Sequence, residues 1–576
     1  MAKRRWLAGL WLFPVACGGG DGVAPPLPPC TSGGFAVNLA APGDYTAIDP
    51  GPVSGCTVFP AAPPGSQVEY LLVPQSASSK PNDSQNFNLL GAALALAGMG
   101  PQFSAREAAR AELAPAEQFH LFLRQSERAR SYTVPPRPQR AAGAQLTAQA
   151  PPPPRRPLTP ADSGMVYSFK VCGNLDCTTL PTVEATLMKI GQRSAIYVDT
   201  NAPSPRLSQA DLDGLRAIFD TLLYRVDTLA FGRESDIDGN GVVIVLMTNR
   251  VNQLVPAPTT CPDGYVAGFF FGADIDPFFR TQYNNGEIFY TIVADQGGTL
   301  SCPHPVSQVT RQVPLTLVHE FQHMISYNQH VLVRSGQAGE ILWLNEALSH
   351  YAEERAGRSF LPGDSLSFCR FVAGDLYNAG QYLAAPESYF LVDTAGIGGL
   401  AERGAYWLFL RYLIDQYADP SSSSPPPLLA ADAYTRSLVN TSATGVTNVV
   451  QRAGNTPFAT LVSRWALANW VSDLSGFPAP AELRYKTWAF RSAYPLFSQG
   501  SSWQCTNQLP PAFPLFPGVS PGSAVDLNDV LRAGSGPYHL SQQAAGAPGF
   551  TLLFSDDAGR ALRASLVPRL NVIRIQ

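Results

Sequence analysis

Residues 319–323 read His-Glu-Phe-Gln-His, and this short segment carries the clearest chemistry in the sequence. Histidines at positions i and i+4 of a helix project from one face with about 6 Å between their Cβ atoms, so His319 and His323 can reach one metal ion. Glu320 follows the first histidine, where its carboxylate can meet a water molecule on the metal without binding the metal itself. The segment therefore predicts a helix that carries two zinc ligands and a general base.

A catalytic zinc takes three protein ligands and keeps one open position, so a third ligand must come from elsewhere. A third histidine in the pattern H-E-x-x-H-x-x-G-x-x-H is excluded, because Ser326 and Gln329 occupy the required glycine and histidine positions. Glu346 lies in the segment Trp-Leu-Asn-Glu-Ala-Leu-Ser-His-Tyr, 23 residues after His323 (346 minus 323). This spacing leaves room for a turn and an antiparallel helix, and it makes Glu346 the predicted third ligand.

The two zinc segments resemble those of the hyicolysin family of secreted bacterial metallopeptidases, over roughly residues 190 to 490. The Asn-Glu-Ala-x-Ser core around Glu346 is similar to the third-ligand helix of thermolysin-like gluzincins. Three further segments support the resemblance: Ser235–Gly241, Gly286–Tyr290 and Gly404–Tyr412. The resemblance implies a gluzincin fold and a zinc-dependent endopeptidase, in which zinc activates a water molecule and Glu320 acts as the general base.

The sequence departs from that pattern next to the third ligand. Thermolysin-like enzymes carry an aspartate four residues after the ligand glutamate, where it holds a zinc histidine, but His350 occupies this position here. An imidazole cannot supply the same fixed negative charge. Glu353 and Glu354 follow about one turn later, and either can take over that role.

The group that stabilises the transition state is a second open question. His539 is the only histidine after His350, and it falls in a predicted terminal β unit. Tyr406 and Arg403 lie on a predicted helix that resembles one lining gluzincin sites, so they are the two candidates. The run 286–291 is predicted to be a strand, either an edge strand that pairs with an extended substrate or an ordinary strand of the sheet.

A second metal pattern lies upstream of the zinc segments. Asp236, Asp238, Asn240 and Gly241 match the opening of an EF-hand calcium loop. The twelfth position of such a loop requires an acidic residue, and here it is Met247. Asp-Gly and Asn-Gly pairs also favour the positive φ angles of a hairpin turn. The pattern therefore indicates either a calcium site or an ordinary turn.

The first residues have the features of an export signal. Basic residues at positions 3–5 precede an apolar stretch from Trp6 to Ala16, which at 11 residues is too short to span a bilayer. The run Val-Ala-Cys-Gly at 15–18 resembles the lipobox of bacterial lipoproteins, which implies acylation of Cys17. The chain is therefore expected to be lipid-anchored at a bacterial cell envelope, with an ordinary cleaved secretory signal as the alternative.

The nine cysteines agree with an oxidising environment. Removing Cys17 leaves eight, an even number that favours disulfides in an exported protein. The pairs predicted from proximity in sequence are Cys30–Cys56, Cys172–Cys177, Cys261–Cys302 and Cys369–Cys505. A net charge of −4 argues against nucleic acid as a partner, since nucleic-acid binding needs a basic surface.

A chain of 576 residues predicts several domains, and strand and helix patterns divide them. The predicted fold is multidomain: an N-terminal all-β domain, an α+β metallopeptidase domain with a mixed sheet followed by helices, and a small C-terminal β subdomain. Ser208 and Asp211 predict the start of a helix over Gln209–Arg225. The predicted boundaries are 1–17 for the signal, 18–29 for a flexible tether, 30–186 for the β domain with an Ala/Pro/Arg-rich insertion at about 101–163, 187–495 for the metallopeptidase domain and 496–576 for the C-terminal subdomain.

Two other functions remain open at this stage. The altered position at His350 and the large β portions are compatible with a surface-anchored binding or adhesion lipoprotein whose peptidase fold is inactive. An aminopeptidase of the gluzincin clan is the third option, but the Gly-x-Met-x-Asn segment that resembles such enzymes is absent. The expected partners are protein or peptide substrates, with membrane contact through the lipid anchor alone.

Overall fold

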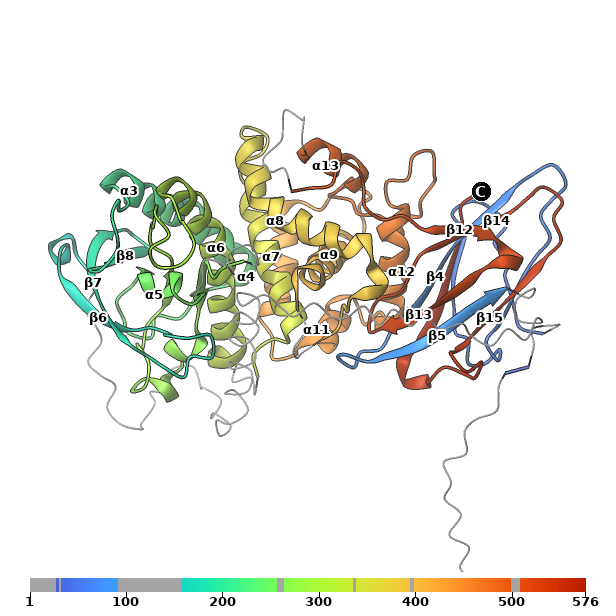
Figure 1. Cartoon of the computed structure of the whole chain (residues 1–576), viewed down its shortest axis with the longest axis horizontal. Coiled ribbons are helices and arrows are strands. Elements are labelled where there is room, and N and C mark those ends of the chain that lie inside the picture. Colours follow the sequence, from blue (N-terminus) through green and yellow to red (C-terminus); the bar gives the residue numbers. More distant parts are fainter. Residues whose placement is uncertain are drawn as a thin grey trace, which may run out of the picture.

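The computed structural model describes residues 27–28, 30, 33–91, 157–255, 264–334, 338–393, 398–498 and 508–576. Three regions follow one another along the long axis: a sheet flanked by helices, a block of helices, and a β-sandwich that contains the C-terminus (Figure 1). The molecule is therefore multidomain and mixes α and β structure. No described helix is long and apolar enough to cross a membrane.

The first region is built on a six-stranded mixed sheet. Its strands, in spatial order, are β10 (Gly268–Phe270), β11 (Ile288–Thr291), β9 (Val243–Met247), β8 (Ser194–Asp199), β7 (Thr182–Ile190) and β6 (Val166–Lys170). The central strands β8, β9 and β11 run parallel, and the outer strands pair antiparallel. Every residue of β9 is buried, which is why its sequence is an unbroken apolar run rather than an alternating one.

The structure corrects the predicted boundary at residue 187. Strands β6 and β7 were assigned to the N-terminal β domain, yet β7 pairs directly with β8 in the six-stranded sheet. The assignment was wrong because the residues of a strand indicate that it is half-buried but do not indicate which strand it pairs with. The region built on the six-stranded sheet therefore includes β6 and β7, and does not begin at 187.

The third region is a sandwich made from both ends of the described chain. One sheet has the order β1 (Phe35–Ala36), β3 (Cys56–Phe59), β15 (Phe550–Asp556), β5 (Ser84–Gly91) and β13 (Asp526–Arg532). The other has the order β12 (Gly518–Pro521), β14 (His539–Gln543), β4 (Val68–Ser76), β16 (Pro568–Arg574) and β2 (Tyr45–Ile48). The predicted N-terminal domain and C-terminal subdomain are thus one unit, because their strands alternate within each sheet.

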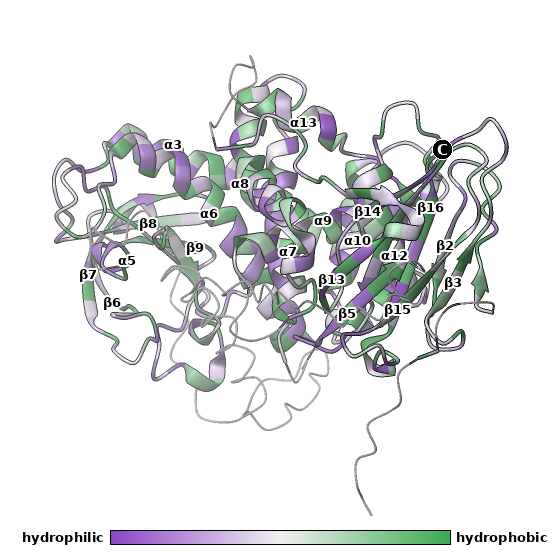
Figure 2. Cartoon of the chain, turned by 45° about the vertical axis from the view of Figure 1, so that its right-hand side comes forward, coloured by the Kyte–Doolittle hydropathy of each residue, from purple (hydrophilic) through white to green (hydrophobic). Residues whose placement is uncertain are grey.

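Strand β4 connects this sandwich to the helices. Tyr70 and Leu72 belong to the core of the sandwich, whereas Leu71 and Val73 belong to the larger core shared with the helices. Successive side chains of a strand point to opposite faces, so both faces of β4 are covered. Helix α12 (Phe458–Val471) packs on the outer face of β4, and Figure 2 shows it beside the strands of the sandwich.

Helices fill the space between the two β regions. Helices α3 (Gln209–Ile218) and α6 (Val306–Tyr327) pack on the six-stranded sheet. Helices α4 (Tyr224–Phe231) and α5 (Asn249–Asn252) follow α3 in sequence, and α7 (Leu342–Arg358) follows α6. The remaining helices are α8 (Ser365–Ala384), α9 (Leu400–Tyr417), α10 (Leu428–Val439), α11 (Gly445–Arg452), α12 and α13 (Phe490–Phe497). The capping box of Ser208 and Asp211 is confirmed, and helical structure continues through a wide five-residue turn to Phe231.

The disulfides agree with the predicted pairing as far as the structure describes it. Cys30–Cys56 and Cys172–Cys177 are both formed. Cys302 and Cys369 are also disulfide-bonded. Their predicted partners, residues 261 and 505, lie outside the described residues, as do Cys17 and the whole signal segment.

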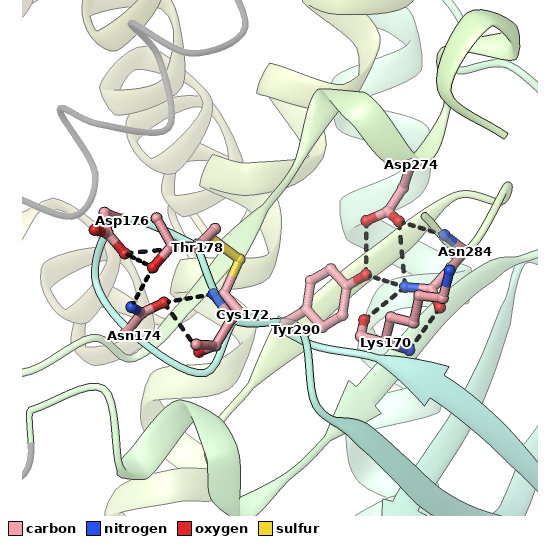
Figure 3. The surroundings of a disulfide bond; sticks show 10 residues. Lys170, Cys172, Asn174, Asp176, Thr178, Asp274, Asn284 and Tyr290 are labelled. Carbon is pink, nitrogen blue, oxygen red and sulfur yellow. Dashed lines mark hydrogen bonds between the residues drawn. A yellow bond between two sulfur atoms is a disulfide. The ribbon is translucent and has the colours of Figure 1, made fainter. Parts of the chain in front are cut away.

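The Cys172–Cys177 loop lies beside a polar network that fastens the segment between β10 and β11 (Figure 3). The carboxylate of Asp274 accepts hydrogen bonds from the Tyr290 hydroxyl at 2.6 Å and from the Asn284 backbone amide at 2.9 Å. The Asn284 side chain also donates to the carbonyl of Lys170 at 2.7 Å and accepts from the backbone amide of Lys170 at 2.8 Å. This network ties β6, β11 and the intervening segment to one another.

Candidate metal centre

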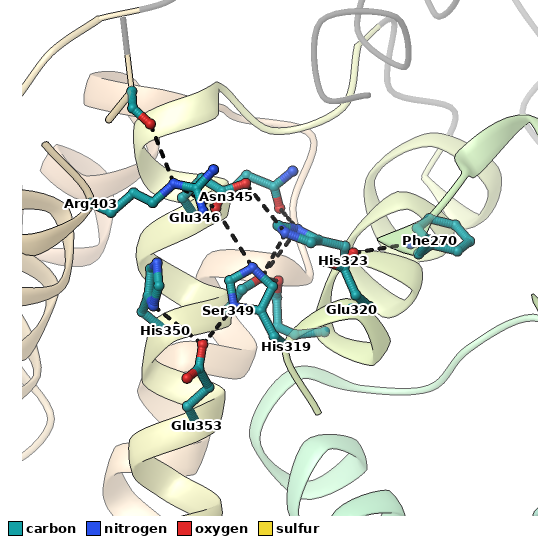
Figure 4. A network of polar contacts seen from close by, with 12 residues as sticks. Phe270, His319, Glu320, His323, Asn345, Glu346, Ser349, His350, Glu353 and Arg403 are labelled. Carbon is teal, nitrogen blue, oxygen red and sulfur yellow. Dashed lines mark hydrogen bonds and ion pairs between the residues drawn. The ribbon is translucent and has the colours of Figure 1, made fainter. Parts of the chain in front are cut away.

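Two helices bring the predicted zinc ligands together. His319 and His323 lie one turn apart on α6, and their ring centroids are 4.9 Å apart. Glu346 lies in the second turn of α7, which packs against α6, and its carboxylate faces both rings (Figure 4). All three side chains are almost fully buried, so the helices present them to one another rather than to solvent.

The distances between these groups fit a bound metal ion. Glu346 Oε2 lies 3.6 Å from His319 Nε2, and Glu346 Oε1 lies 3.4 Å from His323 Nε2. Tetrahedral zinc ligands at bond lengths of roughly 2.0–2.2 Å lie about 3.3–3.6 Å from one another. Glu346 Oε2 is buried and has no hydrogen-bond partner in the described part of the chain. A metal ion between the three side chains would satisfy that oxygen.

Glu320 is placed beside these ligands and toward the sheet. Nitrogen and oxygen atoms of His319, Glu320 and His323 lie within 4.8 Å of one another. The backbone amide of Phe270 on β10 donates a hydrogen bond to Glu320 Oε2 at 3.1 Å. This bond holds the Glu320 carboxylate between the two histidines and β10.

The order of the sheet decides between the two alternatives for residues 286–291 in favour of an ordinary strand. Strand β11, which covers most of residues 286–291, lies between β10 and β9 and is an inner strand. Within the described sheet, β10 is the terminal strand on this side, and it is β10 that packs on α6. The short apolar run of β10 has no feature that distinguishes an outer from an inner strand.

A series of polar side chains in contact with one another supports the His319 ring on its Nδ1 side. Glu353 Oε1 lies 2.7 Å from His319 Nδ1 and 3.3 Å from His350 Nδ1. His350 Nδ1 lies 2.9 Å from Asp375 Oδ1 on α8. Glu353 therefore supplies the carboxylate that the substitution by His350 removes, and His350 links it to a second carboxylate. Sequence analysis missed Asp375, because nothing in its local sequence distinguishes it.

The pKa values of these side chains reflect the same contacts. Burial on its own lowers the pKa of His319, but the carboxylates of Glu346 and Glu353 outweigh burial and raise it to about 10. Burial raises the pKa of Glu353, but hydrogen bonds to His319 and His350 outweigh it and bring the pKa to about 2. Glu353 is therefore a charged acceptor that holds the His319 ring with its Nε2 toward Glu346.

The second histidine is held by neutral groups. His323 Nδ1 lies 3.1 Å from Asn345 Oδ1, and the Ser349 hydroxyl lies 3.1 Å from the same ring nitrogen. The Ser349 hydroxyl also bonds Gln322 Oε1 at 2.6 Å. The Asn-Glu-Ala-x-Ser segment thus provides one ligand and two groups that orient another.

The two candidates for transition-state stabilisation differ in their placement. Arg403 Nε lies 3.8 Å from Glu346 Oε2 and 3.3 Å from the carbonyl of Gly398 (Figure 4). Burial would raise the pKa of Glu346, but Arg403 and the two histidines hold it well below its usual range. Tyr406 is fully buried one turn further along α9, and the described residues show no contact between it and the three ligands. The structure therefore brings Arg403, but not Tyr406, to the metal centre.

Glu354 faces away from the metal centre. It accepts hydrogen bonds from the indole nitrogens of Trp407 at 3.1 Å and Trp488 at 2.9 Å. It also pairs with Arg358 Nε at 2.7 Å and with Arg411 Nη1 at 3.4 Å. Consecutive residues of a helix point about 100° apart, so Glu353 reaches α6 while Glu354 reaches α9.

The second metal pattern forms a separate cluster. Carboxylate oxygens of Asp236, Asp238 and Glu287 lie within 4.8 Å of one another. Burial raises the pKa of Glu287 to about 7, and the charges of Asp238 and Asp236 add to the rise. The side chain of Asn240 donates to Asp238 and accepts from the backbone amide of Val242, so it is used within the turn. Glu287 was missed because it lies far along the chain from the turn.

Part of the chain is similar to a known metalloprotease. No protein-family model matches the chain. Over 135 residues the chain is 30% identical to the neutral metalloprotease ShpI of Staphylococcus hyicus. The matched segment is 23% of this chain and 28% of that protein, so the likeness covers a part of each. That relative is a metalloprotease, and this chain carries a cluster of histidines and glutamates that could hold a metal ion.

Proposed function

We propose that this protein is a zinc-dependent endopeptidase of the hyicolysin type with a gluzincin metal centre. The observation that carries the proposal is the convergence of His319, His323 and Glu346. The Glu346 carboxylate oxygens lie 3.4 Å from His323 Nε2 and 3.6 Å from His319 Nε2, and Glu320 lies beside them. Two imidazoles and one carboxylate form the ligand set of catalytic zinc in thermolysin-like enzymes. The likeness to a neutral metalloprotease points to the same chemistry.

The residues divide the work of peptide hydrolysis. When bound, zinc supplies Lewis acidity that polarises the scissile carbonyl and lowers the pKa of water toward about 7. Glu320 accepts the proton of the attacking water and passes it to the leaving amine. Arg403 is placed to stabilise the negative charge that develops on the carbonyl oxygen. Glu353 and Asn345 hold the two histidine rings in orientation.

Metal content and proteolysis test this proposal together. Wild-type protein should contain one zinc per chain, cleave casein, and lose activity with a zinc chelator. Glu320→Ala should retain its zinc but lose about 10²- to 10⁴-fold in kcat, the usual contribution of a general base. Glu184→Gln, a surface carboxylate on β7, is the control and should retain full activity.

Two outcomes would favour a different function. Equal casein cleavage by wild type and Glu320→Ala would contradict the enzyme and favour a binding or adhesion protein with an inactive peptidase fold. Cleavage that requires a free substrate N-terminus would indicate an aminopeptidase. An N-terminally blocked peptide that is still cleaved would exclude the aminopeptidase.

The proposed location is the bacterial cell envelope, through acylation of Cys17. The basic, apolar and cysteine pattern of residues 3–18 supports export. Wild-type protein should fractionate with membranes and carry a lipid on its N-terminal cysteine by mass spectrometry. Cys17→Ala should be recovered without lipid. A wild-type N-terminus downstream of residue 17 would instead indicate an ordinary secretory signal.

A further inference from the structure

A cluster of three carboxylates lies at the start of two parallel strands, apart from the zinc ligands. Asp236 and Asp238 belong to the loop between α4 and β9, and Glu287 immediately precedes β11. Their oxygens lie within 4.8 Å of one another. Because β9 and β11 are parallel neighbours, their N-terminal ends meet at one edge of the sheet and bring the three residues together.

Glu287 is the informative member of the cluster. Its side chain is 1% exposed. Oε1 accepts hydrogen bonds from the Ser235 hydroxyl and from the backbone amide of Ile237, the latter at 3.0 Å. Oε2 is buried and has no hydrogen-bond partner among the described residues. A buried carboxylate oxygen without a partner, next to two further carboxylates, is unfavourable unless a cation satisfies it.

The turn itself does not explain this arrangement. Gly239 and Gly241 have φ angles of 71° and 80°, which accounts for the glycines. Asp236 Oδ1 accepts from the amide of Gly241, and Asp238 Oδ1 accepts from the amide of Asn240, each at 3.1 Å. These bonds account for the Asp and Asn residues of a tight turn. They do not involve Glu287, whose Oε1 is bonded by Ser235 and Ile237 while its buried Oε2 has no hydrogen-bond partner among the described residues.

We propose that Asp236, Asp238 and Glu287 bind a calcium ion that joins the turn before β9 to the start of β11. The three side chains offer oxygen atoms alone, which suits Ca²⁺ rather than zinc. Calcium takes six to eight oxygen ligands in flexible geometry, so backbone carbonyl groups and water can complete the shell. Glu287 thereby takes the acidic role that Met247 cannot take in the linear sequence motif.

The ion would brace the sheet next to the catalytic helix. The backbone amide of Ile244 on β9 donates to the carbonyl of Glu287 at 2.7 Å, and the amide of Gly286 donates to the carbonyl of Asp274 at 3.0 Å. Asp274 is the centre of the network that fastens the segment between β10 and β11 (Figure 3). Calcium would therefore stabilise the strands that lie against α6, without touching the zinc ligands.

Calcium binding is tested on the full-length, zinc-loaded protein, freed of other divalent ions by passage over a desalting column. Addition of about 5 mM CaCl₂ should raise the melting temperature by roughly 3 °C or more, because the ion binds the folded chain and not the unfolded one. Terbium should bind one site with sensitised luminescence, and calcium should displace it. The same concentration of MgCl₂ should have a smaller effect, because Mg²⁺ demands stricter geometry.

Variants locate the site. Glu287→Gln should weaken calcium binding by at least about tenfold, since affinity follows ligand charge. In calcium-free buffer it should melt no lower than wild type, because the substitution removes repulsion between like charges. Asp238→Asn should show the same loss of binding and serves if Glu287→Gln fails to fold. Glu234→Gln, a carboxylate of the same loop that lies outside the cluster, should retain the full calcium response.

Three results would overturn the proposal: no calcium-dependent shift in the wild type, an equal shift with magnesium, or a full calcium response in Glu287→Gln. None of these readouts depends on proteolysis. A protein that binds calcium and cleaves nothing would contradict the proposed function alone. A calcium-independent protease would contradict this inference alone.

Discussion

At the scale of single residues, Glu353 and Glu354 are neighbours with opposite surroundings. Glu353 bonds His319 of the candidate metal centre, whereas Glu354 is enclosed by arginine and tryptophan side chains. The pair therefore offers a matched test of which carboxylate serves the metal centre. It also separates an effect on metal affinity from an effect on stability.

Glu353→Gln is expected to weaken zinc affinity by about 10- to 100-fold, the usual effect of removing a group that orients a metal ligand. The cause is the loss of the charged acceptor at His319 Nδ1. Competition with a fluorescent zinc chelator measures the affinity. Glu354→Gln is the control and should bind zinc as tightly as wild type; equal losses in both variants would contradict this assignment.

Glu354→Gln is expected to lower the free energy of unfolding by about 3–5 kcal/mol at neutral pH, because it leaves buried arginine charge without its partner. Urea unfolding measures this difference. Zinc content and kcat of the folded protein should not change. A variant as stable as wild type would show that the arginines find other partners.

The effect of Glu354→Gln on the free energy of unfolding is expected to depend on pH. Burial raises the pKa of Glu354, but Arg358 and Arg411 outweigh burial and lower it below its usual range. A carboxyl group with a depressed pKa stabilises the folded state fully above its unfolded pKa of about 4.3, and the stabilisation is lost as pH falls through the folded pKa. The stability difference between wild type and Glu354→Gln should therefore shrink on acidification. A difference that grows at low pH would contradict this.

At the scale of helices, the metal centre depends on how closely α8 and α9 approach. A Cβ atom added to Gly404 on α9 would lie 2.2 Å from the carbonyl oxygen of Asn378 on α8. Helix α9 carries Arg403, and α8 carries Asp375, so both ends of the polar network around the ligands rest on this contact. Gly404 is required here by the close approach of two backbones.

Gly404→Ala is expected to lower the free energy of unfolding by about 1–3 kcal/mol, the usual effect of overpacking, because the clash is with backbone that cannot rotate away. Gly374→Ala on the exposed side of α8 meets no atom within 4 Å. It should be neutral or stabilising by about 0.5–1 kcal/mol, since alanine is the better helix former. Thermal or urea unfolding of both variants measures the contrast; similar destabilisation by both would contradict the close-contact argument.

At the scale of the whole molecule, the sandwich joins the two ends of the described chain. β4 pairs with β14 and β16, and β5 pairs with β13 and β15. Each of these N-terminal strands thus has C-terminal strands on both sides. Removal of residues 33–91 would expose unpaired strand edges and the apolar core of the sandwich. The N-terminal segment is therefore a structural part of the folded protein and not a detachable piece.

A specific cleavage between the two parts tests this. A protease site is introduced within residues 140–150, in the Ala/Pro/Arg-rich stretch, and the folded protein is treated with that protease. The two fragments should co-elute in size-exclusion chromatography, retain peptidase activity, and separate only in denaturant. An N-terminal fragment that leaves without denaturant, with activity retained or increased, would instead identify it as a removable prosegment.

Particular residues show how far sequence reasoning reached. His319, Glu320 and His323 could be placed on one helix face, because the helical period alone brings positions i and i+4 together. Glu346 followed from the number of metal ligands required and from a resemblance, and the structure brings it to the same point. The choice between Glu353 and Glu354 stayed open, because it depends on which helix each face of α7 meets.

Strand pairing and other long-range contacts were predicted less well. β units were predicted near both ends of the chain, but they were assigned to separate domains because their strands were grouped by proximity in sequence. Asp375 and Glu287 were missed for the same reason, since each meets its cluster only through the packing of α8 on α7 or the pairing of β11 with β9.

The sequence by itself predicted the His319, Glu320, His323 and Glu346 cluster and two described disulfides, because these follow from spacing within short segments. Only the tertiary structure decided which carboxylate supports His319, that Glu287 closes an acidic cluster with Asp236 and Asp238, and that both chain ends form one sandwich. The physical reason is that strand pairing and helix packing join residues far apart in sequence. The free energy of such contacts depends on the whole fold and not on any one segment.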